Sequence, residues 1–433
     1  MAVFDTGPID NMDIPRTTQL TIRLFNTGRL PALVGIEAYF ISPAGDGFGS
    51  KTIYVLELIE LNPFNSPDPA YTLEDVYADL DVFGVRVLTS GLGADDIAIT
   101  VLEKGSEGQI IKEHVLEGEL SRIQELLFAY VANIGDTVNV INTATNTILT
   151  TIALPAGSGS NGVATTPDGV WAYIVNQFND TITVISTETN AIQTAIALPA
   201  GSSPVEMTIT SDGSRAYVTD FGNDTVTVID TATNTILTTI PLPAGSGPSV
   251  IAITPDGSRA YVANFNNSTV TVINTATNTI VTTIPLPAGS FFEGIAITPD
   301  GSRVYVTSFA IATVPVIDTA TNTILTTISL PVGSGPFGVA ITPDGSRAYV
   351  VNELTDSVAI INTATNTILT TFSLPTGTGP SRIAITPDGS RAYITNVAGE
   401  SVSVIDTVKN TFITALPAGF TPSGVDITPI LLF

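Results

Sequence analysis

Residues 251–290 read IAITPDGSRAYVANFNNSTVTVINTATNTIVTTIPLPAGS, and close copies of this stretch recur along the chain at a step of 44 residues. Two landmarks mark the step. The first is an Asp-Gly pair, which begins at residues 168, 212, 256, 300, 344 and 388. The second is an (Asn/Asp/Ser)-Thr-X-X-Asn stretch, which begins at residues 142, 186, 230, 274, 318, 362 and 406. A repeat of this length indicates a propeller or a solenoid built from similar units.

Each copy predicts a four-stranded antiparallel sheet. Four short runs rich in β-branched residues alternate in the period-2 manner of strands, and turn residues separate them. Gly257 suits a tight turn between the first and second runs, because glycine accepts the positive φ angle that such turns demand. The Asn- and Thr-rich stretch at 274–278 joins the third run to the fourth, and residues 286–290 lead to the next unit.

The number of copies and their offset predict a closed ring of seven blades. The second run carries a tyrosine in each copy, at Tyr130, Tyr173, Tyr217, Tyr261, Tyr305, Tyr349 and Tyr393. The array opens on this second run near Leu126 and ends on a lone first run at residues 424–428. We expect the last run to complete the blade begun by residues 126–153, because closure removes exposed sheet edges. The predicted fold is therefore all-β, with a seven-bladed β-propeller over residues 121–433.

Residues 1–120 lack the repeat and predict a small antiparallel β-sandwich domain in front of the propeller. Alternating apolar runs lie at residues 19–25, 32–41, 51–59, 82–88 and 97–102. Residues 1–13 have little periodicity. They either complete a sheet within their own domain or add a strand to a neighbouring subunit.

The two ends of the chain supply the candidate residues for self-assembly. Residues 429–433 form an apolar tail, which would favour aggregation if it were exposed. We expect the tail to pack on the propeller, on the sandwich or on an adjacent molecule. The assembly candidates are Val3, Phe4, Ile9, Leu431, Leu432 and Phe433.

The repeat resembles the YVTN-type β-propeller repeats of prokaryotic surface-layer and related exported proteins. The matching residues are the tetrads at 217–220, 261–264 and 393–396, the Pro-Asp-Gly turns, and the stretches at 228–234 and 316–322. The resemblance covers about residues 126–428 and departs from the pattern at Ser211, Val304 and Pro315. It implies the propeller fold and an extracellular or cell-surface location, and it says little about activity.

Charge and composition exclude several partners. The net charge is −25, with 15 Lys and Arg against 40 Asp and Glu, so binding to nucleic acid or to an anionic membrane surface is disfavoured. No run of residues is apolar and long enough for insertion into a membrane. The chain has no Cys, which excludes disulfides and thiolate chemistry. The first residues show neither a basic nor an apolar segment of a signal peptide.

One rim of the predicted propeller carries the residues that vary between copies. Strand order places the second-to-third turns and the blade-to-blade connections on this rim, together with Glu293 and Arg382. Aromatic side chains that gather on one face can anchor a partner or a glycan, or they can pack between blades. The candidate binding residues are Phe178, Phe221, Phe265, Phe291, Phe292, Phe309, Phe337 and Phe420.

Sequence features of a catalytic site are sparse. The single histidine, His114, lies outside the repeats and is interpreted as a surface or linker residue. Without Cys or a second His, the common nucleophile and base pairs are unavailable. Asp and Asn could hold a hard cation, but no calcium-loop spacing supports a metal site. The Asp and Arg residues that recur with the repeat, such as Asp256 and Arg259, are interpreted as turn residues. No catalytic residue, metal or cofactor is predicted.

The leading hypothesis from the sequence is a non-catalytic extracellular or cell-surface structural protein. In it the sandwich anchors or polymerises and the propeller is a binding module, with partners that are other copies of the chain or components of the cell envelope. A glycan or a protein is the expected ligand. The alternative is a soluble ligand- or glycan-binding sensor propeller, and a cation-dependent propeller hydrolase or lyase ranks last.

Overall fold

The computed structural model describes residues 127–428 throughout and, before them, the backbone of nine strands between Ala2 and Val115. The chain divides into two compact units, Met1–Glu125 and Leu126–Phe433. Both units are built from β-strands, and the described part contains only one short 3-10 helix, η2 (Glu353–Thr355).

The strands of the first unit form two antiparallel sheets. One sheet has the order β1-β7-β4-β5, and β2 also pairs with β7; its strands are β1 (Ala2–Asp5), β2 (Ile9–Asp10), β4 (Ala32–Ile41), β5 (Lys51–Leu61) and β7 (Val82–Ser90). The other has the order β6-β3-β8-β9, with β3 (Gln19–Asn26), β6 (Ala70–Tyr77), β8 (Ile97–Lys104) and β9 (Ile110–Val115). The packing of the two sheets as a sandwich stays a prediction.

The opening residues of the chain pair with their own unit. The backbone of Val3 and Phe4 lies in β1, opposite Leu88 and Val87 of β7, and Ile9 lies in β2, opposite Phe83. Leu431, Leu432 and Phe433 lie outside the described residues. Self-assembly through either end of the chain stays a prediction.

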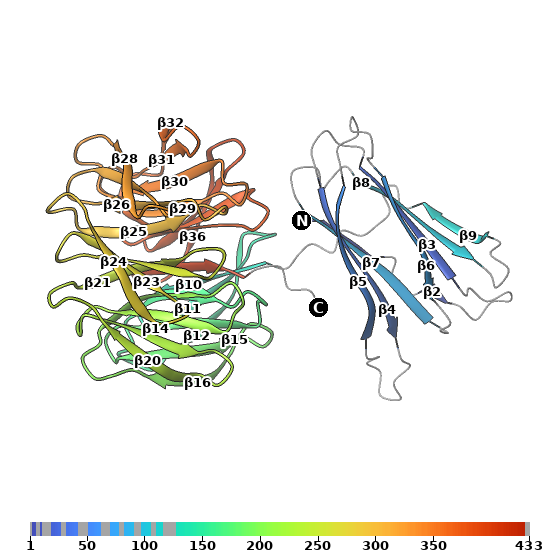
Figure 1. Cartoon of the computed structure of the whole chain (residues 1–433), viewed down its shortest axis with the longest axis horizontal. Coiled ribbons are helices and arrows are strands. Elements are labelled where there is room, and N and C mark those ends of the chain that lie inside the picture. The colour runs from blue at the N-terminus through green and yellow to red at the C-terminus, as the bar shows by residue number, and fades with distance from the viewer. Residues whose placement is uncertain are drawn as a thin grey trace. The chain divides into compact units, whose positions relative to one another are not determined.

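The second unit is a seven-bladed β-propeller of four-stranded sheets (Figure 1). The first, innermost strands are β13 (Ser160–Thr165), β17 (Pro204–Ile209), β21 (Pro248–Ile253), β25 (Phe292–Ile297), β29 (Pro336–Ile341), β33 (Pro380–Ile385) and β37 (Pro422–Ile427). The second strands are β10 (Phe128–Asn133), β14 (Trp171–Asn176), β18 (Arg215–Asp220), β22 (Arg259–Asn264), β26 (Arg303–Ser308), β30 (Arg347–Asn352) and β34 (Arg391–Asn396).

The outer half of each blade is equally regular. The third strands are β11 (Thr137–Asn142), β15 (Thr181–Ser186), β19 (Thr225–Asp230), β23 (Thr269–Asn274), β27 (Thr313–Asp318), β31 (Ser357–Asn362) and β35 (Ser401–Asp406). The fourth strands are β12 (Thr147–Ala153), β16 (Ala191–Ala197), β20 (Thr235–Pro241), β24 (Thr279–Pro285), β28 (Thr323–Ser329), β32 (Thr367–Ser373) and β36 (Thr411–Pro417). We number the blades 1 to 6 from β13–β16 to β33–β36.

Blade 7 joins the two ends of the propeller unit. Its strand order is β12-β11-β10-β37, so the last strand pairs with the first one of the unit. Tyr130 of β10 lies opposite Asp426 of β37, and Val131 lies opposite Val425. Figure 1 shows the cyan and red ends of this unit next to each other. The pairing with β37 therefore covers the edge that β10 would otherwise expose and closes the ring.

The recurring Asp-Gly pair forms the turn between the first and second strands. Gly257 has a φ of 69°, which only glycine adopts without cost. The Asp256 carboxylate accepts hydrogen bonds from the Thr254 hydroxyl at 2.5 Å and from the Ser258 amide at 3.0 Å. Arg259 donates to the carbonyl oxygen of Thr319 in the next blade at 2.6 Å. These contacts agree with a structural role for the repeated Asp and Arg residues.

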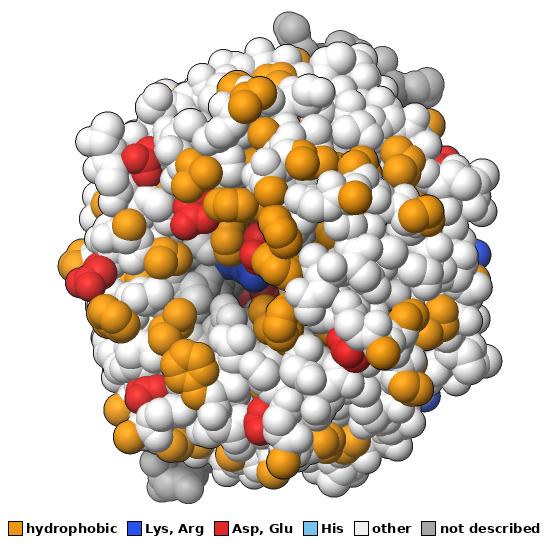
Figure 2. Space-filling model, turned by 90° about the vertical axis from the view of Figure 1, so that its left-hand side faces the viewer, with side chains coloured by type: hydrophobic (Ala, Val, Ile, Leu, Met, Phe, Trp, Pro, Cys, Tyr) orange, Lys and Arg blue, Asp and Glu red, His pale blue; other side chains and the backbone are white. Residues whose placement is uncertain are grey.

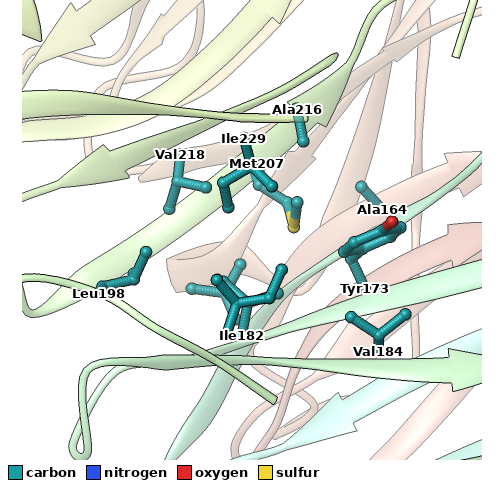
Figure 3. Packing of buried hydrophobic residues seen from close by; sticks show 11 residues of the cluster. Ala164, Tyr173, Ile182, Val184, Leu198, Met207, Ala216, Val218 and Ile229 are labelled. Carbon is teal, nitrogen blue, oxygen red and sulfur yellow. The ribbon is translucent and has the colours of Figure 1, made fainter. Parts of the chain in front are cut away.

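Apolar side chains of neighbouring blades interlock to form the core. Between blades 1 and 2, Tyr173 and Ile182 pack with Met207 and Val218 in one buried cluster (Figure 3). Similar clusters lie between the other blades. Burying a side chain of this size is worth about 1.5 to 3 kcal/mol, so these interfaces are the main source of the propeller's stability.

Candidate functional site

The seven first strands surround a cavity of about 350 Å³ on the propeller axis. Every one of these strands contributes to the lining, from Thr165 of β13 to Asp426 of β37. Figure 2 looks onto one face of the propeller unit and shows a hollow at its centre. Hydrophobic side chains gather around the hollow, and acidic and basic side chains lie inside it. We call this cavity the channel pocket.

The third residue of each first strand determines the charge of the channel pocket and the space inside it. The seven equivalents are Gly162, Glu206, Val250, Gly294, Gly338, Arg382 and Gly424. Five of them are glycine or valine, and the two charged ones stand on blades 2 and 6. Glycine is required where strands crowd: a Cβ at Gly294 would lie 2.3 Å from the carbonyl oxygen of Phe337. The small residues leave room for two long charged side chains to meet.

Glu206 and Arg382 form an ion pair across the channel. The Arg382 Nε atom lies 3.7 Å from Glu206 Oε2, and only 17% and 12% of the glutamate and arginine side chains are exposed. Arg382 also donates to the carbonyl oxygen of Glu293, and its guanidinium lies over the Phe337 ring at 5.0 Å from the centroid. A desolvated guanidinium held in this way can stabilise a negative oxygen in the pocket.

The carboxylates of the channel have altered acidities. Burial raises the pKa of Glu206, while Arg382 lowers it in part. Burial also raises the pKa of Glu293, to about 7, with a lowering effect from Arg382 and a raising effect from Glu353. A carboxylate whose pKa moves toward neutrality is suited to accept and return a proton.

A third carboxylate lies deeper in the channel. Asp426 is the fifth residue of β37, where the other first strands carry alanine or threonine. Its Oδ2 atom accepts hydrogen bonds from the amide and the hydroxyl of Thr165, at 2.7 and 2.8 Å. Burial raises its pKa, and the two hydrogen bonds oppose that rise. The channel pocket therefore combines one cation with an excess of acidic groups.

The rim with the second-to-third turns and the blade connections borders the mouth of this channel, and we call it the connection rim. The turns and connections touch each other: Asp180 in the β14–β15 turn accepts hydrogen bonds from the amides of Gly201 and Ser203, both at 2.7 Å. The connection rim contains the aromatic residues that we predicted to bind a partner. Three of these are well exposed, namely Phe178, Phe291 and Phe420, and four are half-buried, namely Phe221, Phe265, Phe309 and Phe337.

Phe292 is not a surface residue, and its place among the predicted binding residues is wrong. Its side chain is 0% exposed and belongs to the cluster between blades 3 and 4, with Val250 and Val304. The prediction treated Phe292 as part of a connection, but β25 already begins there and pairs it with Ser308. A strand residue turned toward the neighbouring blade becomes part of the core.

Sequence reasoning missed the ion pair at the centre of the channel. Arg382 and Glu293 were placed only on the variable rim, and Glu206 was not singled out. A signal was present, since both charged residues interrupt a position that is glycine in four other copies. That signal becomes clear only when the third residues of the first strands are compared with each other.

The described residues show neither a metal cluster nor a membrane span. Among them, no three His, Asp or Glu side chains gather closely enough to hold a metal ion. In the same part of the chain, no helix is long and apolar enough to cross a membrane.

Comparison with known proteins shows similarity to enzymes. The model of a family described as lactonase, 7-bladed beta-propeller, matches residues 200–308 and 294–411. No curated protein matches the chain. The matched residues span just under half of the chain, so the match shows similarity to the family and not membership of it.

Several solved structures share the fold. The hydrazine synthase of Kuenenia stuttgartiensis is 24% identical, with 62% of this chain and 90% of that chain covered and a TM-score of 0.55. A functionally unknown protein from Desulfotomaculum acetoxidans DSM 771 is 20% identical, with coverages of 69% and 98% and a TM-score of 0.60. A putative 6-phosphogluconolactonase from Bacteroides fragilis NCTC 9343 is 16% identical, with coverages of 71% and 99% and a TM-score of 0.58.

The similarity to a lactonase family contradicts two predictions from the sequence, that the protein is a non-catalytic structural protein and that it is not an enzyme. Both predictions were wrong because they considered mainly His and Cys as catalytic groups. Ester hydrolysis needs only a base for water and a cation for the carbonyl oxygen, and a carboxylate and a guanidinium supply both.

Proposed function

We propose that the propeller is a hydrolase that opens lactones, which are cyclic esters, in the channel pocket. Two observations support this proposal. The family model that matches residues 200–411 is described as a lactonase. Glu206 and Arg382 meet in the channel pocket, and the volume of that pocket suits a small cyclic ligand.

The Glu206 carboxylate acts as the base in the proposed reaction. It removes a proton from a water molecule while the water oxygen adds to the lactone carbonyl carbon. The carbonyl oxygen takes up the electron pair of its π bond and becomes negative. The ring C–O bond then breaks, and the leaving oxygen takes the proton back from Glu206. The product is a hydroxy acid, and it releases one proton to the solvent near neutral pH.

Arg382 stabilises the negative oxygen that forms in this step. Its guanidinium is nearly buried, and in such surroundings a charge acts more strongly than in water. The Phe337 ring and the Glu293 carbonyl oxygen hold the guanidinium in place. The substrate carbonyl oxygen binds to the donors of Arg382 that these contacts leave free.

The observation that carries the proposal is the ion pair itself. Charged residues are costly in a channel of low exposure, and this propeller puts two of them where its other blades have glycine or valine. The seven blades do not need this pair for packing, since five of them fold without a charge at that position. The extracellular or cell-surface location and the resemblance to surface-layer repeats stay predictions.

A titration of released acid tests the proposal. The full chain is incubated with δ-valerolactone, γ-butyrolactone and gluconolactone, and the rate of proton release is compared with that of Glu206→Gln. We expect the substitution to lower kcat by about 100-fold or more, because it removes the base. Glu188→Gln is the matched control, since Glu188 is an exposed carboxylate in the β15–β16 turn, and it should keep the full rate. No lactone hydrolysis by the wild type, or full activity in Glu206→Gln, would overturn the proposal.

A further inference from the structure

Five phenylalanines of the connection rim, namely Phe221, Phe265, Phe291, Phe309 and Phe337, follow one another in an arc that leads to Arg382. Phe221 and Phe265 meet edge to face, with ring centroids 6.2 Å apart, and Phe265 lies 4.9 Å from Phe291. The amide of Phe309 donates to the carbonyl oxygen of Phe291 at 3.1 Å, and the Phe309 ring meets Phe337 at 6.1 Å. Phe337 in turn covers the guanidinium of Arg382. The arc therefore runs from blade 2 to the cation of the channel pocket.

Phe291 is held in this arc at a cost in backbone energy. Its φ is 48°, in the left-handed region that bulky residues avoid. In the other connections this position is Gly159, Gly247, Gly335 or Gly379, for which the conformation is free of strain, or Ser203 or Thr421, which adopt it as well. The Phe291 side chain is 41% exposed, so burial in the core does not repay the strain. Phe291 is the only bulky aromatic residue at this position in the seven connections, it contacts Phe265, and its remaining surface faces solvent, where a ligand can bind.

The charges around the pocket oppose an anionic ligand. Arg382 is the one cation that lines the pocket, and Glu206 already pairs with it. Glu293 and Asp426 add further acidic groups, and Glu353 lies close enough to Glu293 to raise its pKa. The whole chain carries a net charge of −25. A phosphorylated substrate would therefore meet a net negative charge both on the protein and around the pocket.

We infer that the substrate is an uncharged lactone with an apolar, ring-sized substituent, which lies on the arc of Phe221, Phe265, Phe291, Phe309 and Phe337 while the lactone ring enters the channel pocket. This inference rests on the proposed function. The pocket volume of about 350 Å³ accommodates one small ring with its ester group. The aromatic arc offers the substituent an apolar surface next to Arg382.

Two matched substrate pairs test the inference. The first pair, γ-phenyl-γ-butyrolactone and γ-butyrolactone, differs only in the phenyl group. We expect the phenyl group to raise kcat/KM by about tenfold or more, because it is buried on the arc. The second pair, 6-phosphogluconolactone and gluconolactone, differs only in the phosphate, which should lower kcat/KM by about tenfold or more.

The variant Phe291→Asn ties the preference to the arc. Asparagine tolerates the left-handed conformation, so the melting temperature should stay the same or rise. The preference for the phenyl lactone, which is the ratio of the two kcat/KM values, should fall toward one. Phe412→Leu is the control, since Phe412 lies on the fourth strand β36 with 36% exposure, and it should keep the preference.

The outcomes separate the two proposals. Hydrolysis of none of these lactones would overturn the proposed function and the inference together. Hydrolysis with a preference for the phosphorylated over the plain gluconolactone would overturn the inference and leave the proposed function standing. An undiminished phenyl preference in Phe291→Asn would show that the arc does not bind the substituent, and would also overturn the inference.

Discussion

The hydroxyl of Tyr393 donates a hydrogen bond of 2.6 Å to the side-chain oxygen of Asn146, across 247 positions of the sequence. The same bond links each of the six remaining pairs of neighbouring blades. The acceptors there are Asn190, Asn234, Asn278, Asn322, Asn366 and Asn410. These asparagines all have a positive φ at the end of the Thr-rich turn. Two residues that recur with the repeat, the tyrosine of the second strand and the asparagine of the Thr-rich turn, therefore form one contact between neighbouring blades.

Tyr393→Phe is expected to destabilise the propeller by about 1 to 2 kcal/mol, because it removes both hydrogen bonds that the tyrosine hydroxyl donates across the boundary between two blades. The lost bonds are those to Asn146 and to the carbonyl oxygen of Thr143. Urea denaturation measures the effect, and Tyr217→Phe is the comparison inside the ring. A closed ring predicts similar losses for both variants. A loss in Tyr217→Phe alone would show that blades 6 and 7 are not joined.

Asp220→Asn is expected to stabilise the protein at neutral pH. Asp220 is 0% exposed at a position where β10, β14, β22, β30 and β34 have asparagine, and burial raises its pKa to about 6 from the ordinary 3.8. Between these values the folded protein keeps a proton that the unfolded chain has lost, so the free energy of unfolding falls as the pH rises. The asparagine removes this deficit, a gain of about 2 to 3 kcal/mol above pH 6.

Melting curves at pH 7.5 and at pH 3.5 check the sign of this effect. The advantage of Asp220→Asn should be present at the higher pH and mostly lost at the lower one, where the aspartate is largely protonated in both states. Asp212→Asn is the control from the turn, because hydrogen bonds from Thr210 and Ser214 lower the pKa of Asp212. It should bring no gain at either pH. An equal gain from Asp220→Asn at both pH values would contradict the explanation.

Lactone hydrolysis is expected to have a bell-shaped pH profile. The rising limb follows ionisation of Glu206, since only the carboxylate accepts the proton of water. The falling limb lies near pH 7, where Glu293 ionises and its added negative charge weakens the effect of Arg382. In Glu293→Gln, kcat/KM measured from pH 5 to pH 9 should lose the falling limb and keep the rising one. Persistence of both limbs would exclude Glu293 as their origin.

Arg382→Met is expected to destabilise the protein by about 3 kcal/mol at pH 8, because it leaves the buried Glu206 carboxylate without its cation. The loss should become smaller as the pH falls, because burial raises the pKa of Glu206 and protonation removes the uncompensated charge. The double variant with Glu206→Gln should recover most of the stability. Denaturation of the four proteins of this cycle gives the coupling between the two residues. Simple addition of the two single effects would show that the ion pair contributes nothing.

The fold could be predicted because its determinants are local and repeated. Gly257 marks a turn by its own φ, and the spacing between Tyr261 and the next turn asparagine recurs in all copies but the first, which is one residue shorter. The strands of each blade follow from these landmarks and from the alternation of β-branched residues. Phe292 was misplaced because the boundary between a connection and a strand depends on the neighbouring blade, which no single copy contains.

The candidate site was harder to predict for a different reason. Glu206 and Arg382 are 176 positions apart in the numbering and become neighbours only because the ring closes. Each looks like an isolated charge in its own copy. The aromatic arc was visible as a set of residues on one rim, but its connection to Arg382 through Phe337 required the structure.

A crystal structure of the protein with δ-valerolactam would place the reacting group directly. This lactam has the shape of a lactone and resists hydrolysis. We predict that its carbonyl oxygen lies within hydrogen-bonding distance of the Arg382 guanidinium, with Glu206 on the side from which water adds. A lactam bound only on the outer surface, in crystals of a protein that hydrolyses lactones, would contradict the assignment of the channel pocket as the active site.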